Sequence, residues 1–271
     1  MKFVKLTFQY IKGKHFWKLA ALTLLPSLLF SFLSSFSNIA SFFVNFFDQN
    51  LSSFAAIYSK LIDVNGKNFV FVILSIVVFS SIIAILIGAM QRHMRTGKFS
   101  AKNTFRRIND NFMPTILVLV ILYIIIYMFG FLISLLIAFW FAVTKIQLAT
   151  LILSAFFTLV IFIVLAYLIS LFCLSTPFMV TTGAGIFSSA SSSIRTTRNH
   201  IKDIFVAITL PLIPLFALEY VAVIINIWIV SILIDTFFVS FLMCYYPVLI
   251  FVTYYDIQQM DREDLLPVNR L

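Results

Sequence analysis

Apolar residues along this chain are gathered into six long runs, separated by shorter polar segments. The runs cover residues 19–36, 69–90, 113–143, 148–175, 204–234 and 237–255. The second run alone provides 22 residues without a charge, enough for a helix to cross a hydrocarbon layer of about 30 Å. Only Thr144–Gln147 and Asp235-Thr236 separate two adjacent pairs of runs, so each pair should form an antiparallel hairpin. The pattern predicts an all-α fold: a polytopic transmembrane helical bundle with six spans, forming one membrane domain over residues 1–271.

Composition agrees with lipid as the main solvent. Of the 271 residues, 62% are hydrophobic and 11% are charged, and 33 are phenylalanine, whereas soluble domains are about half apolar and a quarter charged. The net charge of +9 is confined to short segments between the apolar runs. That distribution is typical of signals that set membrane topology. We therefore expect no nucleic-acid partner.

Basic and neutral segments alternate along the chain. Residues 1–18 carry +5, residues 91–112 carry +5 and residues 176–203 carry +2, whereas the intervening segments carry 0, +1 and −1. The positive-inside rule then places both termini and both long basic segments in the cytoplasm. The lysine-rich start also fits a signal peptide, but no small-residue cleavage site follows Phe30, which favours an uncleaved first span.

Three cytoplasmic segments show amphipathic spacing: residues 2–14, 91–112 and 186–205. Residues 2–14 place Phe3, Leu6 and Tyr10 on one side, which predicts an interfacial helix, with an ordinary basic tail as the alternative. Helical spacing also puts the bases of residues 186–205 on one stripe about 60° wide. The bases that we expect to contact anionic lipid headgroups are Arg106, Arg107, Arg195, Arg198 and Lys202; topology determination alone is the competing explanation. The phenylalanine-rich segment 37–68 is expected to rest on the membrane.

Glu219 is the one acidic or basic residue that falls well inside a predicted span, and Asn226 lies seven residues later on the same helix face. A charge at membrane depth costs about 3 kcal/mol or more, which makes this position a functional candidate. One interpretation is a proton or cation site near the midplane. The favoured one is a protonated glutamate that bonds Asn226, Tyr245 or Tyr246, because the other spans contain no charged residue.

No pattern of catalytic or metal-binding residues is present. The three histidines, His15, His93 and His200, lie beside bases without suitably placed acids or cysteines, so we expect no metal site and no cofactor. Cys173 and Cys244 lie within apolar runs, where they behave as small hydrophobic residues. No P-loop, nucleophile elbow or zinc-protease motif occurs, so the chain is not expected to be an enzyme. The serines of residues 188–193 suit either phosphate binding or helix capping and close packing.

One segment resembles a known family. The residues that carry the resemblance are Thr176-Pro177-Phe-Met-Val, then Gly183 and Gly185, then Ala190 and Ser193, with Tyr254-Tyr255-Asp256 near the end. They are similar to motifs of a bacterial six-span family that includes the membrane domain fused to some glycerophosphodiester phosphodiesterases and related uncharacterised integral membrane proteins. The chain departs from that family at Ser191, where leucine is frequent. The catalytic barrel of the fused enzymes has no counterpart in these residues, so the resemblance implies a membrane module without phosphodiesterase activity.

The expected function is therefore that of a non-catalytic scaffold or accessory subunit in envelope or lipid-linked processes. Its partners would be anionic membrane lipids and a protein in the membrane or cytoplasm. The alternative is a permease-like transporter subunit whose basic loops dock a cytoplasmic ATPase.

Overall fold

The computed structural model describes the chain except for residues 14–15, 34–36, 50–52, 63–65, 98–107 and 266–271. All regular elements in the described part are helices, which confirms the all-α prediction. They are α1 Lys2–Ile11, α2 Phe16–Leu33, α3 Ser37–Val44, η1 Phe46–Asp48, α4 Phe54–Ile62, α5 Gly66–Thr96, α6 Ile108–Thr144, α7 Gln147–Phe172, α8 Ser175–Thr182, α9 Ile186–Thr197, η3 Arg198–His200, α10 Ile201–Thr209, α11 Leu212–Ile225, α12 Trp228–Ile257 and η4 Glu263–Leu265.

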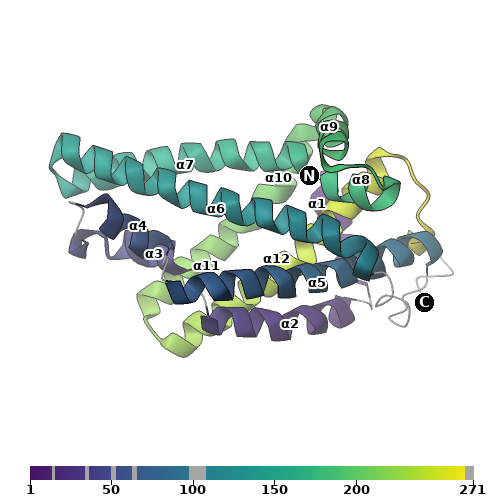
Figure 1. The fold of residues 1–271 in the computed structure, drawn as a ribbon, viewed down its shortest axis with the longest axis horizontal. Helices are drawn as coiled ribbons and strands as arrows, with labels where there is room; N and C mark the ends of the chain where they lie inside the picture. The colour runs from purple at the N-terminus through teal and green to yellow at the C-terminus, as the bar shows by residue number, and fades with distance from the viewer. Residues whose placement is uncertain (14–15, 34–36, 50–52, 63–65, 98–107, 266–271) are drawn as a thin grey trace.

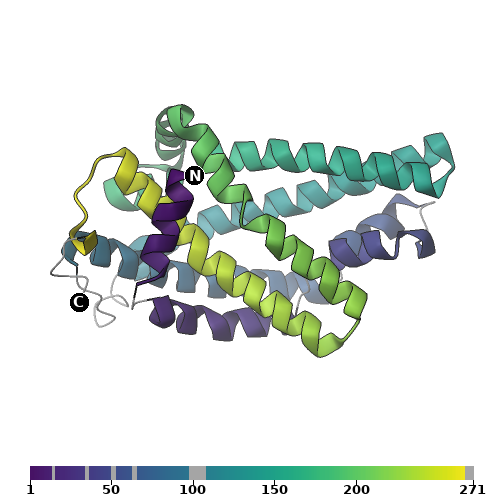
Figure 2. The same cartoon turned by 180° about the vertical axis from the view of Figure 1, so that it is seen from behind.

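The long helices run back and forth along one axis, so that their connections collect at two ends (Figures 1 and 2). One end holds α1, the last turns of α5, α8 to the start of α10, and the tail after α12; we call it the basic end. The opposite end, which we call the far end, holds α3, α4 and the tight turns after α6 and α11. Contacts between distant segments join the basic end together: the Met1 amino group lies 2.7 Å from Asp203, and Lys2 Nζ lies 2.6 Å from Asp256.

Five helical stretches of the described chain are long and apolar enough to cross a membrane. They are Ile73–Thr96, Asn111–Thr144, Gln147–Thr182, Ile186–Ile225 and Ile229–Ile257. The remaining long helix, α2, has 18 residues, a length of about 27 Å. It packs along α12 through small polar residues, with Thr23 Oγ1 bonded to Ser240 Oγ at 2.8 Å. Such residues let two helix backbones approach closely inside a bilayer.

The last two spans are joined at a different place from the one that the sequence predicts. The helices turn at Asn226-Ile227, and Asp235 and Thr236 lie inside α12, so the predicted connection at Asp235-Thr236 is wrong. Asn226 ends α11 in the left-handed conformation, with φ 52°, which asparagine tolerates better than most residues. The charge of Asp235 favours a loop at that position, but the backbone turns at Asn226, which adopts a positive φ.

The predicted run 204–234 is also interrupted within its first turns. Helix α10 ends at Thr209, and α11 starts at Leu212 after a turn through Pro211. Proline has no N–H and clashes with the preceding turn, so a helix breaks or kinks there. The carbonyl groups that this break frees are bonded by side chains of α12: Tyr245 Oη donates to the oxygen of Ala207, and Tyr246 Oη to that of Ile208, each at 2.9 Å.

Segment 37–68 contains helices that pack against the bundle. Phe42, Phe46 and Ile57 are almost fully buried, and they share one cluster with Ile133 and Ile137 of α6. The prediction that these phenylalanines rest on the membrane is therefore corrected for Phe42 and Phe46, which face protein. Phe47, at 54% exposure, does remain available to the surroundings.

Candidate functional site: the basic end

The segment between α7 and α9 positions the basic end. Helix α7 stops at Phe172, the chain turns, and the short helix α8 follows. Ser193 of α9 covers this break: the Leu174 N–H donates to Ser193 Oγ at 3.1 Å, and the hydroxyl donates to the Leu171 carbonyl at 2.8 Å. Thr197, one turn later, also donates to the Leu171 carbonyl, at 3.2 Å. The buried hydroxyls of α9 therefore cap another helix, and two of the serines, Ser189 and Ser193, face protein.

The other residues of the predicted loop motif have backbone roles. Pro177 is buried in the first turns of α8. Gly183 ends α8 with φ 66°, and its N–H donates to the Met179 carbonyl at 3.0 Å; this left-handed position favours glycine. Gly185 precedes the first turn of α9 in an extended conformation. These residues shape the α8–α9 corner, which carries the bases that follow.

Helix α1 has the predicted amphipathic character, but its apolar side packs on protein. Phe3 is 1% exposed and lies in a cluster with residues of α10 and α12. Leu6, Tyr10 and Ile11 pack against the main core around α5 and α12. Helix α1 therefore packs against α5, α10 and α12 at the basic end, whereas Lys5 and Lys12 remain exposed.

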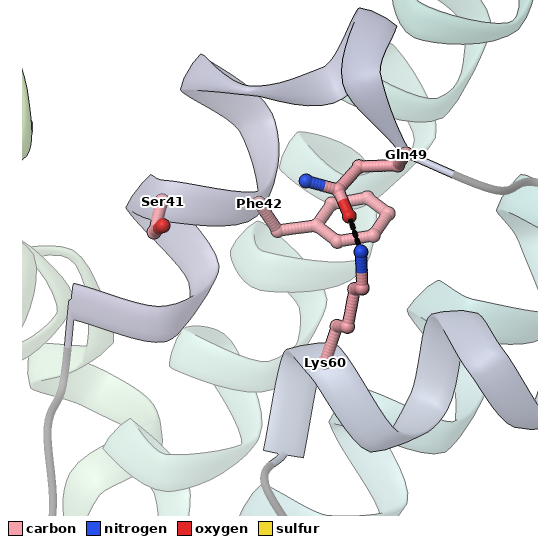
Figure 3. A pocket seen from close by; sticks show the side chains of 4 residues that line it. All are labelled: Ser41, Phe42, Gln49 and Lys60. Atoms are coloured by element: carbon pink, nitrogen blue, oxygen red, sulfur yellow. Dashed lines mark hydrogen bonds between the residues drawn. The ribbon is translucent and has the colours of Figure 1, made fainter.

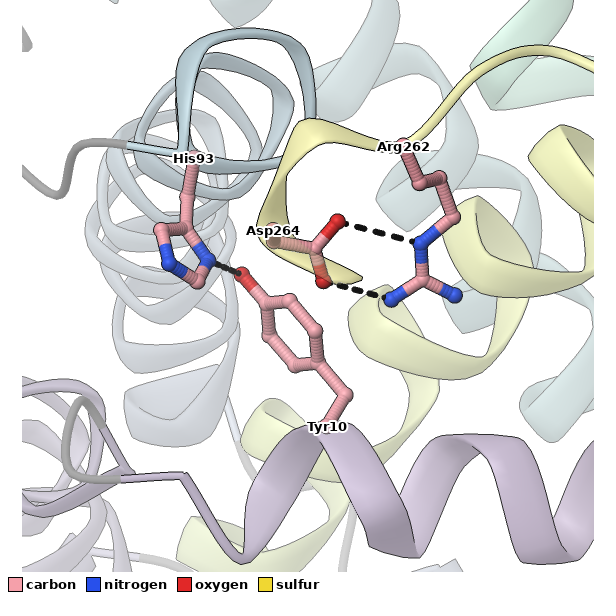
Figure 4. A network of polar contacts seen from close by, with 4 residues as sticks. All are labelled: Tyr10, His93, Arg262 and Asp264. Carbon is pink, nitrogen blue, oxygen red and sulfur yellow. Dashed lines mark hydrogen bonds and ion pairs between the residues drawn. The ribbon is translucent and has the colours of Figure 1, made fainter. Parts of the chain in front are cut away.

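The chain after α12 folds back towards α1, beside Tyr10 (Figure 4). Arg262 and Asp264 form a two-pronged ion pair, with Nη2 to Oδ2 at 2.7 Å, and their side chains are 8% and 5% exposed. The Arg262 guanidinium lies 5.9 Å from the centre of the Tyr10 ring. On the other side, the Tyr10 hydroxyl bonds Nδ1 of His93 at 3.1 Å. Burial and the negative charge of Asp264 raise the pKa of Tyr10, while the charge of Arg262 acts in the opposite direction.

Several acids of the basic end are neutralised by these contacts. Asp203 pairs with the amino terminus, Asp256 with Lys2, and Asp264 with Arg262. The predicted headgroup residues Arg195, Arg198 and Lys202 are all exposed, and none of them takes part in an ion pair within the described residues. They do not share one helix, because η3 separates α9 from α10. Arg106 and Arg107 lie outside the described residues.

Helix α9 lies across the bundle. Figure 1 looks nearly along the axis of α9, whereas the long helices run across the view. Phe187 at its start is 90% exposed, and Ile186 is 38% exposed. Exposed apolar residues therefore lie near the start of α9, and the exposed bases Arg195 and Arg198 lie at its other end.

A second polar feature lies inside the bundle. Glu219 of α11 and Asp235 of α12 are each 2% exposed, and their carboxyl groups interact. Glu219 lies seven residues before Asn226 and Asp235 lies eight residues after Ile227, about 10 and 12 Å along their helices, which is why they meet. Both Glu219 carboxylate oxygens are shielded from solvent.

The predicted environment of Glu219 is therefore corrected. Tyr245 and Tyr246 bond backbone carbonyls of α10, and the exposed Asn226 caps α11; none of the three is the partner of Glu219. Asp235 lies between two predicted spans, so the sequence pattern gives no sign that it faces Glu219. Its position opposite Glu219 follows only once Asn226 is recognised as the turn.

The far end has a small pocket of about 240 Å³, lined by Ser41, Phe42, Gln49 and Lys60 (Figure 3). Lys60 Nζ donates to Gln49 Oε1 across it. None of the four described lining residues is an acid, a histidine or a cysteine. Among the described residues, no group of three histidine, cysteine or acidic side chains is placed to bind a metal ion.

Comparison with protein-family models, with curated proteins and with solved structures finds no match for this chain. The resemblance to the six-span family therefore stays a prediction.

Proposed function

We propose that this chain is a non-catalytic integral protein of a bacterial cytoplasmic membrane, and that its basic end rests on the anionic cytoplasmic leaflet. It serves there as a scaffold or accessory subunit in envelope or lipid-linked processes. One observation carries the proposal: neighbouring acids are paired with the amino terminus, Lys2 and Arg262, while Arg195, Arg198 and Lys202 are exposed without such a partner in the described chain.

The arrangement of the bundle supports this placement. The described bases of the N-terminal segment, of the end of α5 and of residues 195–202 all lie at the basic end. With α2 as a sixth crossing, an even number of crossings puts both termini on one side, and the excess of bases favours the cytoplasm. Exposed bases near a bilayer each gain about 1 kcal/mol from anionic lipid.

The test is the lipid preference of the full-length protein in bilayers that contain both phosphatidylglycerol and phosphatidylcholine. Spin-labelled lipids report the ratio of the two association constants. The combined change Arg195→Gln, Arg198→Gln and Lys202→Gln should reduce the preference for phosphatidylglycerol several-fold. Lys60→Gln, a change at the far end, is the matched control and should leave it unaltered. An unchanged ratio in the triple variant would refute the lipid role.

A second candidate function, a membrane subunit of a transporter, is favoured by the Glu219–Asp235 pair. Buried acids in a membrane bundle are costly and frequently mark ion or proton pathways. A permease-like subunit that docks a cytoplasmic ATPase should yield a nucleotide-binding partner in fixed ratio on purification in mild detergent. Recovery of the chain with lipid alone would count against transport.

A further inference from the structure

An apolar groove runs along the outside of the bundle between α7 and α10. Its walls are Ile163, Val164 and Tyr167 of α7, and Ile201, Lys202, Phe205 and Val206 of α10. The groove has a volume of about 570 Å³, within the range of about 300–1,000 Å³ that small-molecule sites occupy. Ile163, Val164 and Tyr167 are each close to half exposed, at 47%, 53% and 47%. The groove is therefore open to the surroundings along one side.

One end of the groove carries polar groups, and the rest of it is apolar. Helix α7 runs towards the basic end, whereas α10 starts there and runs away from it (Figure 2). The side chains with polar tips, Tyr167 and Lys202, consequently lie at the end of the groove nearer the basic end. The deeper part is lined by Ile163, Val164 and Val206. A lipid has the same polarity, with a charged head at the interface and an acyl chain below it.

The charge of Lys202 is available at the mouth of the groove. Its neighbour Asp203 is held by the Met1 amino group at 2.7 Å, so it does not neutralise Lys202. No ion pair involves Lys202 in the part of the chain that the structure describes. A lysine on an apolar helix face extends its ammonium group to the level of the phosphates while its stem covers apolar surface.

From this geometry we propose that the groove between α7 and α10 is a discrete site for one anionic phospholipid. An acyl chain lies along Val164 and Val206, and the phosphate is bound by Lys202. The proposal rests on the proposed contact with the anionic leaflet and goes further, since it assigns one saturable position instead of a diffuse attraction by all the bases.

The test is native mass spectrometry of the full-length protein in mild detergent, titrated with phosphatidylglycerol or with phosphatidylcholine of the same acyl chains. The unaltered protein should retain one phosphatidylglycerol at concentrations where phosphatidylcholine is not retained. Lys202→Gln removes a charged contact to the phosphate and should weaken retention about tenfold. Val164→Trp and Val206→Trp fill the groove from opposite walls and should do the same.

Two controls separate the site from general effects. Lys12→Gln removes an exposed base at the end of α1, outside the groove, and Ile213→Trp adds an indole to an exposed position of α11; both variants should retain the lipid. Glycerophosphoglycerol, the headgroup without acyl chains, should not compete. Circular dichroism and gel filtration identify any variant that fails to fold. The test needs only one of the two tryptophan variants, Val164→Trp or Val206→Trp, to fold.

Each outcome decides between the two proposals. The groove site would be overturned, with the leaflet contact left standing, by any of three results. These are retention in both folded tryptophan variants, competition by the free headgroup, and equal losses in Lys12→Gln and Lys202→Gln. Equal retention of phosphatidylglycerol and phosphatidylcholine by the unaltered protein would overturn both.

Discussion

The hydroxyl of Tyr245 donates a hydrogen bond to the backbone carbonyl of Ala207 at 2.9 Å. In an unbroken helix this carbonyl would accept from the N–H of residue 211, but Pro211 has none. Tyr246 bonds the next carbonyl, that of Ile208, in the same way. Because a bilayer offers no water to an open carbonyl, two adjacent tyrosines of α12 make the proline break between α10 and α11 tolerable.

Tyr245→Phe should therefore destabilise the protein by about 1–3 kcal/mol, since it leaves a buried carbonyl without a donor. Thermal or denaturant unfolding in detergent measures the loss. Tyr220→Phe is the matched control: Tyr220 is 39% exposed, and its change should alter stability by less than about 0.5 kcal/mol. Equal effects of the two changes would show that the bond to Ala207 contributes nothing.

Ser193→Ala removes the hydroxyl that joins the Leu174 N–H to the Leu171 carbonyl at the end of α7. We expect a loss of about 1–3 kcal/mol, because both buried backbone groups lose a partner. The exposed Ser191 on the same helix provides the comparison, and Ser191→Ala should be nearly neutral. If both variants unfold at the same temperature as the unaltered protein, α9 does not cap α7.

Tyr10 makes the attachment of α1 sensitive to alkaline pH. Burial and Asp264 raise its pKa above the ordinary value near 10, so the folded state keeps the phenolic proton more tightly than the unfolded state does. The resulting stability is complete below about pH 10 and is lost as the pH rises above it. Tyr10→Phe lacks this contribution.

The measurement is thermal unfolding of the unaltered protein and of Tyr10→Phe at several pH values between 8 and about 12. The difference between the two proteins should shrink as the pH rises, because only the unaltered protein has a phenol at position 10 to ionise. A constant difference would mean that the Tyr10 hydroxyl is not buried as the structure has it. Other tyrosines cancel in the comparison, since both proteins contain them.

The general architecture could be predicted from the sequence, because the hydrophobic period and run length determine it. The hairpin around Lys145, the amphipathic α1 and the glycine corner at Gly183 all lie where the pattern places them. The hydrophobic pattern did not give the helix boundaries, because these depend on the backbone conformation of single residues. Asn226 turns the chain because its backbone adopts a positive φ, and a single residue gives only a weak signal of that.

The partners of buried polar groups could not be predicted from spacing along one helix. Glu219 faces Asp235 because two antiparallel helices share a turn, and an error of nine residues in that turn hides the pair. The apolar face of α1 presents a similar ambiguity. Phe3 and Leu6 have the pattern of an interfacial helix whether they meet lipid or protein, and only the tertiary contacts with α10 and α12 decide between the two.

Cysteine labelling tests whether α2 crosses the membrane. With Cys173 and Cys244 replaced by serine, single cysteines at Lys5, Asp48 or Arg198 sit at exposed positions. An impermeant maleimide should label Lys5→Cys and Arg198→Cys only in inverted vesicles, and Asp48→Cys only in intact spheroplasts. If α2 does not cross, Lys5→Cys and Asp48→Cys will react from the same side. Labelling of Lys5→Cys and Arg198→Cys from opposite sides would contradict the proposed topology altogether.

The Glu219–Asp235 pair yields the last prediction. Two carboxylates side by side in an apolar bundle repel each other strongly, so the pair must hold a proton or a counter-ion. Glu219→Gln cannot ionise and offers Asp235 a hydrogen-bond donor, so we expect stability equal to or above that of the unaltered protein. Glu219→Ala leaves Asp235 buried without its partner and should cost about 1–3 kcal/mol.

Asp235→Asn should behave like Glu219→Gln, and a double-mutant cycle with the alanine variants should reveal a coupling free energy of about 0.5–3 kcal/mol. Additive effects would mean that the two carboxyl groups do not interact. Complementation of a deletion strain by Glu219→Gln separates the two proposed functions. If the pair is structural, the variant should restore the function of the protein in cells. If the pair is a transport site, the variant should fail to do so.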